Sequence, residues 1–315
     1  MKNYDPLEVA RIIGEPKDPR KPYPQLVEAL CETDTAEPEE YVYYFDVLTE
    51  TEKIYVITSD GAVTQENVTP DTPAQLTFVD LATPEYYIKI TDYASRKENV
   101  LARKNMTINR ALNSYETYNV VQLMSTAASS SSQEVTLGSG YTRFSYPHVI
   151  DMLEYVQDYG DNYTLVVGAQ PWKDIKLWDW NDNKYHSLKE AWADLNIEMI
   201  RLSLAGSAAQ VSVDDDNSGG VVATDILAAN AAYLVAKDTE IGKPLLFVRK
   251  KMDSVAALGG VVSSDGDNPE RLVMVSPNPI TVTGTARYLA VGVIGYEQVA
   301  SAVTNPYGVC KFTRS

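Results

Sequence analysis

The chain has 315 residues, a formal net charge of −16 and a pI near 4.6, with 44% hydrophobic and 22% charged residues. This composition is typical of a folded protein with a core of its own. The negative charge argues against a protein that grips the phosphates of nucleic acid, but it allows a wall that encloses nucleic acid without adhering to it. No apolar run is long enough to span a bilayer, and we expect no export signal because the N-terminal residues lack an apolar core.

Residues 1–40 are predicted to form an extended arm, because six prolines fix its backbone and remove hydrogen-bond donors. Within this arm, Leu26–Leu30 is the best candidate for a short helix. The arm ends in an acidic run that contains no basic residue, made of Glu32, Asp34, Glu37, Glu39 and Glu40.

Residues 41–93 are predicted to form strands and turns. Tyr41–Leu48 and Lys53–Thr58 flank a short polar link, which indicates a hairpin, and Asp60-Gly61 marks the next turn. Gln75–Leu81 and Tyr86–Thr91 are typical of strands. Because this unit is thin and polar at its tip, we expect a projecting β-arm that packs on a neighbour.

The strongest helix pattern runs from Arg96 to about Met124 and contains neither Gly nor Pro. Apolar residues recur on one face, at Leu101, Ile108, Leu112, Tyr115 and Leu123. Arg103, Arg110 and Thr117 fall on the opposite face, and the serines of Ser125–Ser132 are expected to end the helix. A single helix of this length in a β-rich chain is consistent either with a strut or with a core helix of a large α+β enzyme.

The remainder of the chain is predicted to mix helices and strands. Pro147 opens a helix that Gly160 ends, and Ser187 caps a second helix that runs through Leu195. Ala231–Ala236 and Pro244–Arg249 are expected to pair as neighbouring strands. Further strands are predicted at Thr164–Gly168, Ile197–Leu204, Leu272–Val275, Ile280–Thr283, Arg287–Gly295 and Val309–Phe312.

Residues for catalysis are hard to find in this sequence. It contains no phosphate-binding loop, dinucleotide fingerprint or nucleophile elbow, and no Cys or His cluster has zinc spacing. His148 and His186 lie close to predicted helix starts, where a lone histidine is usually structural. Two distant cysteines, Cys31 and Cys310, are expected to be buried and reduced, with a disulfide between them as the alternative. We therefore predict no enzyme, and no catalytic, cofactor-binding or metal-ligating residues.

One acidic stretch has the spacing of a calcium loop. Asp214, Asp216, Ser218 and Asp225 fall at its ligand positions, and Gly219 falls at the position of its turn glycine. The strand-like residues before it and the final Asp in place of Glu favour a solvated turn instead. A β-rich, calcium-dependent binding module is the function that this alternative would support.

Three tryptophans lie close together in the segment PWKDIKLWDW, at Trp172, Trp178 and Trp180. We expect them to anchor a loop on the body of the protein, with a platform for a ligand or partner as the alternative.

The order of elements is informative as a whole. A hairpin is followed by the long helix VLARKNMTINRALNSYETYNVVQLM, a Ser- and Gly-rich link, and the segment SYPHVIDMLEYVQDYGDNYTLVVGAQPWKDI. The chain closes with ARYLAVGVIGYEQVASAVTNPYGVCKFTR. This order, over most of the chain, resembles the tailed-bacteriophage major capsid proteins of the Hong Kong 97 fold. The resemblance implies an α+β capsid fold.

The resemblance also implies how the chain is divided. Residues 1–40 would be an N-terminal arm, and residues 41–93 an extended β-hairpin loop, with flanking strands, that lies over a neighbouring subunit. Residues 94–137 would form a peripheral domain with the long helix as its spine. Residues 138–290 would form a mixed α/β axial domain, and residues 291–315 C-terminal strands that return to the body.

The function implied by the resemblance is that of a major capsid protein. Many copies, as hexamers and pentamers, would assemble in the host cytoplasm into the icosahedral head of the virion, enclosing double-stranded DNA without sequence-specific binding. A separate scaffolding protein is expected, with portal and decoration proteins as further partners and no membrane. Lys53 lies near the region where some relatives cross-link subunits, but no partner asparagine or catalytic carboxylate is identified. An encapsulin-like nanocompartment shell is the nearest alternative.

The charges of two predicted segments are complementary. The acidic run at Glu32–Glu40 matches a basic cluster on the long helix, made of Arg96, Lys97, Arg103, Lys104 and Arg110. Positive charge in the first turns of a helix opposes the helix dipole, which indicates that a partner supplies anions. We expect carboxylates of one subunit to meet this basic cluster on another, with a solvated basic face as the alternative.

Overall fold

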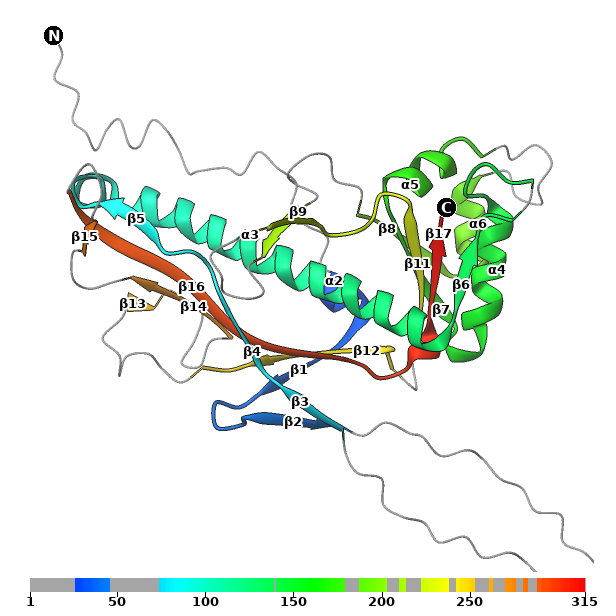
Figure 1. Cartoon of the computed structure of the whole chain (residues 1–315), viewed down its shortest axis with the longest axis horizontal. Coiled ribbons are helices and arrows are strands. Elements are labelled where there is room, and N and C mark those ends of the chain that lie inside the picture. The colour runs from blue at the N-terminus through cyan, green and yellow to red at the C-terminus, as the bar shows by residue number, and fades with distance from the viewer. Residues whose placement is uncertain are drawn as a thin grey trace, which may run out of the picture.

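The computed structural model describes residues 26–45, 74–138, 140–178, 187–202, 210–213, 222–237, 242–252, 261–262, 270–275, 280–282 and 288–314. Within these ranges the protein is a mixed α+β structure in which one long helix, α3, runs along two separate β-sheets (Figure 1). The predicted α+β class is therefore confirmed. No helix among the described residues is long and apolar enough to cross a membrane.

Helix α3 spans Ile90–Ser131, so it is longer at both ends than the sequence predicts. The serines expected to end it are helical, because their hydroxyls donate to carbonyls one turn back in the same helix: Ser130 to Thr126 at 2.8 Å and Ser131 to Ala127 at 3.0 Å. The helix ends at Ser132, which adopts a left-handed conformation with φ of 58° and donates its backbone N–H to the last carbonyls.

The apolar face of α3 is confirmed in part. Ile108 and Leu112 are buried as predicted, whereas Thr117, predicted on the opposite face, is buried as well. The second half of α3 packs against helix α2 (Leu26–Leu30) in addition to the sheets, and strand β9 (Gln210–Val213) also contacts the helix. This part of the helix therefore lies inside the protein, where a single apolar stripe is not required.

The larger sheet has eight strands and is organised around β16, a 16-residue strand at Tyr288–Val303. Along its length β16 pairs antiparallel with β15 (Ile280–Val282), β5 (Tyr86–Lys89), β14 (Arg271–Val275), β4 (Val79–Ala82) and β12 (Leu245–Lys250). Two outer strands complete the sheet, β1 (Cys31–Ala36) beside β12 and β13 (Val261–Val262) beside β14. A strand close to the C-terminus thus pairs with strands that are distant from it in sequence.

The smaller sheet has five strands in the order β6, β17, β11, β7, β8. Their bounds are Glu134–Thr136, Val309–Thr313, Ala231–Lys237, Asn162–Val167 and Ile197–Arg201. Alternate residues face opposite sides: Tyr233 and Val235 belong to the core that contains α3, and Ala232 and Leu234 to the core beneath the other helices. These helices are α4 (Tyr146–Val156), with the 3-10 turn η1 (Gln157–Tyr159), α5 (Ala169–Ile175) and α6 (Leu188–Asp194).

The two predicted helix starts in this region are confirmed. Pro147 lies in the first turn of α4 after the N-cap Ser145, and the Ser187 side chain accepts a hydrogen bond from the Glu190 backbone N–H at 3.3 Å at the start of α6.

One predicted strand pairing differs from the structure. Ala231–Ala236 and Pro244–Arg249 are strands, but β11 and β12 belong to different sheets, because both edges of β11 are already occupied by β17 and β7. Strand β2 (Val42–Phe45) pairs with β3 (Ala74–Thr77). Its expected partner Lys53–Thr58 and the turn at Asp60-Gly61 lie outside the described residues.

The predicted arm is only partly an arm. Residues 1–25 lie outside the described residues. Leu26–Leu30 is helical as predicted, and the residues after it form β1 in the larger sheet, because Cys31 and Ala36 are both buried in its cores. Cys31 and Cys310 are buried and form no disulfide, as expected, and burial raises the pKa of each thiol to about 12.

Candidate assembly surfaces

The larger sheet separates two layers of the protein. Along β12, Leu245 and Phe247 pack in the core shared with α3, whereas Leu246 and Val248 pack in a core shared with β2 and β3. Because neighbouring residues of a strand point to opposite faces, α3 covers one face of the sheet and the β2–β3 pair covers the other. Figure 1 shows β2 and β3 on the far side of β12 and β16 from α3.

An acidic surface lies on the β2–β3 side and is hereafter called the acidic edge; it consists of Glu32, Asp34, Glu37, Glu39, Glu40 and Tyr41. All six side chains are exposed, Tyr41 to 81%. Its contacts include hydrogen bonds from the Tyr43 hydroxyl to Asp34 and from the Glu37 backbone N–H to Glu40 at 2.9 Å, and Lys251 Nζ lies 2.6 Å from Glu37 Oε1. The Lys250 ammonium lies beneath the Tyr41 ring, 4.8 Å from its centroid.

A basic surface lies on α3 and is hereafter called the basic face; it consists of Arg103, Met106 and Arg110. These residues are about half a turn away from Ile108 and Leu112, which pack on β16. Arg103 and Met106 are exposed and Arg110 is half-buried. Nearby, Lys104 instead turns toward the sheet, with its Nζ 4.6 Å from the Tyr86 ring centroid. Of the predicted basic cluster, the side chains of Arg96 and Lys97 lie outside the described residues.

Between helix and sheet lies a buried ionic network. Glu116 of α3 receives two bonds from Arg249 of β12, at 2.8 and 3.2 Å, and one from Arg271 of β14 at 2.8 Å. Arg271 also donates from Nε to Glu297 of β16 at 2.6 Å, and these two residues are direct cross-strand partners. A planar guanidinium that bridges two carboxylates fixes the relative position of the elements that carry them. The network therefore holds α3 in register on the larger sheet.

Glu297 is the buried member of this network whose hydrogen bonds are incomplete. Its side chain is 1% exposed, and its Oε1 has no hydrogen-bond partner in the described part of the chain. Burial raises the pKa of the Glu297 carboxyl to about 7, opposed by the charge of Arg271 and reinforced by that of Glu116. Burial therefore favours the protonated form of Glu297 to a higher pH than in an exposed carboxyl.

The residues considered for chemistry have structural roles where the structure describes them. The His148 ring accepts a hydrogen bond from the Ser145 backbone at 3.1 Å and lies 2.7 Å from the Ser145 hydroxyl, so it holds the start of α4. Trp178 donates from Nε1 to the Phe144 carbonyl at 2.8 Å and contacts Trp192 edge-on. Trp172 packs beside Lys176 and Arg201. His186 and Trp180 lie outside the described residues.

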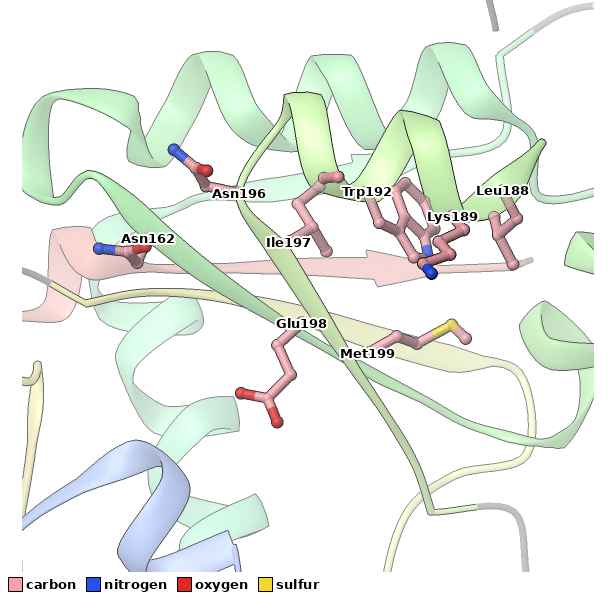
Figure 2. A pocket seen from close by; sticks show the side chains of 9 residues that line it. Asn162, Leu188, Lys189, Trp192, Asn196, Ile197, Glu198 and Met199 are labelled. Carbon is pink, nitrogen blue, oxygen red and sulfur yellow. The ribbon is translucent and has the colours of Figure 1, made fainter. Parts of the chain in front are cut away.

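A shallow groove lies between α6 and β8 (Figure 2). Its floor is apolar, with Trp192, Ile197 and Met199, and Figure 2 shows its charged side chains on different elements, Lys189 on the helix and Glu198 on the strand. Glu198 is paired with Lys237 at 3.6 Å. The lining residues include no His, Cys or Ser.

The calcium-loop alternative falls largely outside the described residues, which exclude Asp214, Asp216, Ser218 and Gly219. The flanks are strands: β9 pairs antiparallel with β10 (Val222–Asp225) as a two-stranded sheet. Calcium loops of this spacing are flanked by helices, so the flanks favour the turn. Among the described residues no group of three or more His, Cys, Asp or Glu side chains is placed to hold a metal ion.

Comparison with known sequences gives no relative. No model of a protein family matches the chain, and no curated protein sequence matches it.

Comparison with solved structures is decisive for the fold. The capsid structure of cyanophage P-SCSP1u superposes with a TM-score of 0.55 over 96% of this chain and 91% of that chain, at 11% identity. The chain has a phage capsid fold. Structures from Mycobacterium phage Cain and Microbacterium phage Oxtober96 also match, each with a TM-score of 0.57 over 99% of both chains, at 12% and 10% identity. In these three comparisons the match covers between 96% and 99% of this chain.

Sequence reasoning missed the ionic network. Glu297 is a lone acid within the apolar strand of β16, and Arg271 and Arg249 lie in the apolar strands β14 and β12. A single charge inside an apolar strand is itself a sign of a buried partner, since unpaired charges are almost never fully buried. The pairing of these residues could not be read without knowing that β14 and β12 flank β16.

Proposed function

We propose that this chain is the major capsid protein of a tailed bacteriophage, and that many copies of it assemble into an icosahedral head that encloses double-stranded DNA. The observation that carries this proposal is the end-to-end correspondence with the cyanophage capsid structure, over 96% of this chain. Self-association is the activity that this proposal assigns to the molecule.

The proposal extends to the division of the chain. Helix α3 and the larger sheet correspond to the peripheral domain of a Hong Kong 97-like subunit, and the smaller sheet with α4, α5 and α6 to the axial domain. Residues 1–40 and 41–93 would contribute the arm and the extended loop. Strands β12 to β15, within residues 138–290, pair in the larger sheet, so the axial domain in this proposal excludes them.

Hexamers and pentamers of this subunit, a separate scaffolding protein, a portal and decoration proteins complete the proposed assembly. It would form in the host cytoplasm and become part of the virion. An encapsulin-like shell is the alternative, and a gene for an enclosed enzyme beside this one would favour it.

Sedimentation velocity and negative-stain electron microscopy on the purified chain, alone and with the product of any neighbouring scaffold gene, test the proposal. We expect rings or closed shells, because a subunit of this kind completes its interfaces only with copies of itself. A monomer under both conditions, at all concentrations, would contradict a shell function.

A further inference from the structure

The basic face and the acidic edge carry opposite charges that cannot meet within one molecule. The basic face projects from the side of α3 that faces away from the sheet, and α3 lies on the sheet face opposite to β2 and β3. The side chains at Glu32, Asp34 and Lys250 share the β2–β3 side, as the Asp34–Tyr43 and Lys250–Tyr41 contacts show. A full sheet layer therefore separates the two surfaces.

The chemistry of the two surfaces is complementary beyond their charge. The acidic edge offers carboxylates beside an exposed tyrosine ring, with Tyr44, 57% exposed, close by in the sequence. The basic face offers guanidinium groups beside Met106, 37% exposed. Guanidinium groups pair with carboxylates and stack on aromatic rings, and thioethers also pack well against such rings.

The basic face is unusual in an acidic protein. The net charge of the chain is −16, yet α3 carries only basic charges from Arg103 to Arg110. Because α3 begins at Ile90, these residues lie beyond its first turn, where the helix dipole has little effect. The acidic edge of another copy is an anionic surface whose chemistry complements the basic face.

We propose that the acidic edge of one subunit docks on the basic face of the next. This inference rests on the proposed self-assembly. Two different surfaces on opposite sides of one subunit form a head-to-tail contact, which generates rings or larger closed assemblies rather than an isolated dimer. Each copy uses both surfaces, so the contact propagates around the assembly.

Charge reversal tests the contact. The basic-face variant is Arg103→Glu with Arg110→Glu, and the acidic-edge variant is Glu32→Lys with Glu39→Lys. Each variant places like charges opposite each other, and we expect the association constant to fall more than about ten-fold. Matched controls reverse exposed charges elsewhere: Lys173→Glu with Lys189→Glu, and Glu154→Lys with Asp158→Lys, which we expect to assemble like wild type.

Mixing the two variants gives the sharper result. In an equimolar mixture, the unchanged acidic edge of the basic-face variant can meet the unchanged basic face of the acidic-edge variant, and the two reversed surfaces also match. We expect the mixture to assemble although neither variant does so alone, and a chain that carries all four substitutions to assemble by itself. Sedimentation velocity measures the assembled fraction in each case.

Three results would overturn the contact: variants that assemble like the controls, a mixture no better than its components, or a four-fold variant that stays dissociated. If wild type itself never assembles, the proposed function fails instead, so the two failures are distinguishable. Should a variant lose its native circular dichroism, the neutral pair Arg103→Gln with Arg110→Gln replaces it. That pair is expected to weaken assembly and flatten its salt dependence, and unchanged salt dependence would refute the contact.

Discussion

Glu297 has a carboxylate with one oxygen bonded to Arg271 and the other without a partner among the described residues. Burying such a group costs free energy that the ion pair only partly returns. In its place, a neutral side chain of similar size would satisfy Arg271 less well but remove the buried charge. The residue thus couples the packing of α3 on the sheet to pH.

The pH dependence has a defined sign. The folded state raises the pKa of Glu297 from 4.5 to about 7, so it binds the proton more tightly than the unfolded state does. This contribution to stability is fully present below about pH 4.5 and is lost as the pH rises through 7, which amounts to about 3 kcal/mol because each pKa unit is worth about 1.4 kcal/mol.

Glu297→Gln is expected to remove this part of the pH dependence. Urea unfolding of the unassembled subunit at several values between pH 5 and about 7.5 measures the slope of stability against pH. Wild type should lose more stability than the variant as the pH rises through this window. The exposed Glu154→Gln serves as the control and should keep the wild-type slope; a Glu297→Gln curve parallel to wild type would show that Glu297 does not titrate there.

At the scale of elements, the contact between α3 and β16 depends on one glycine. A Cβ atom at Gly295 would lie 2.1 Å from Ile108 Cγ2 of the helix, far inside van der Waals contact. The Gly295 backbone is also held on both sides by Thr83, whose hydroxyl accepts from its N–H at 2.9 Å and whose N–H donates to its carbonyl at 2.8 Å. The strand therefore has little room to move away from the helix.

Gly295→Ala is expected to destabilise the subunit by about 1–3 kcal/mol through overpacking. Ile108→Ala alone should cost about 2–5 kcal/mol through the cavity that it leaves. The double variant should cost less than the sum, because the new methyl group occupies the space that the isoleucine vacates. Chemical denaturation measures all three.

Gly138→Ala is the matched control, since the nearest atom to its Cβ is 3.9 Å away in the Tyr141 ring. Strict additivity of Gly295→Ala and Ile108→Ala, within about 0.3 kcal/mol, would mean that the two residues do not pack against each other.

The elements could be predicted where the signals are local. Pro147 and Ser187 begin helices as expected, since proline and a capping serine act within one turn. The sequence pattern predicts an end of α3 that is too early. Serine usually favours helix caps, but here the serine hydroxyls form hydrogen bonds within the helix. Strand partners were misassigned for β11 because sheet membership depends on residues distant in sequence, which a local pattern does not encode.

The two candidate surfaces could likewise be predicted only in part. The acidic run and the basic cluster are visible as charges in the sequence, but their placement on opposite sides of a sheet depends on the alternation of β12 between two cores. The ionic network could not be predicted from the sequence. Its members, Glu116, Arg249, Arg271 and Glu297, come from four elements that only the fold brings together.

At the scale of the whole molecule, net charge decides how the proposed shell would interact with DNA. The chain carries 43 acidic against 27 basic residues. Several of the basic groups form ion pairs within the subunit: Arg249 and Arg271 with buried carboxylates, and Lys251 with Glu37. A wall with this charge would confine DNA by enclosure, because attraction to phosphates needs basic side chains that remain available.

We therefore expect the unassembled subunit not to bind double-stranded DNA. At physiological salt its dissociation constant for a short fluorescent duplex should be weaker than ~10⁻⁴ M, the weak end of ordinary non-specific binding. Fluorescence anisotropy measures this, with a basic DNA-binding protein on the same duplex as the positive control. Saturable binding that weakens steeply with salt would contradict the expectation, and its slope would count the phosphates engaged. Such a result would mean that the basic face of α3 serves DNA, and that the acidic edge of the neighbouring subunit does not occupy it.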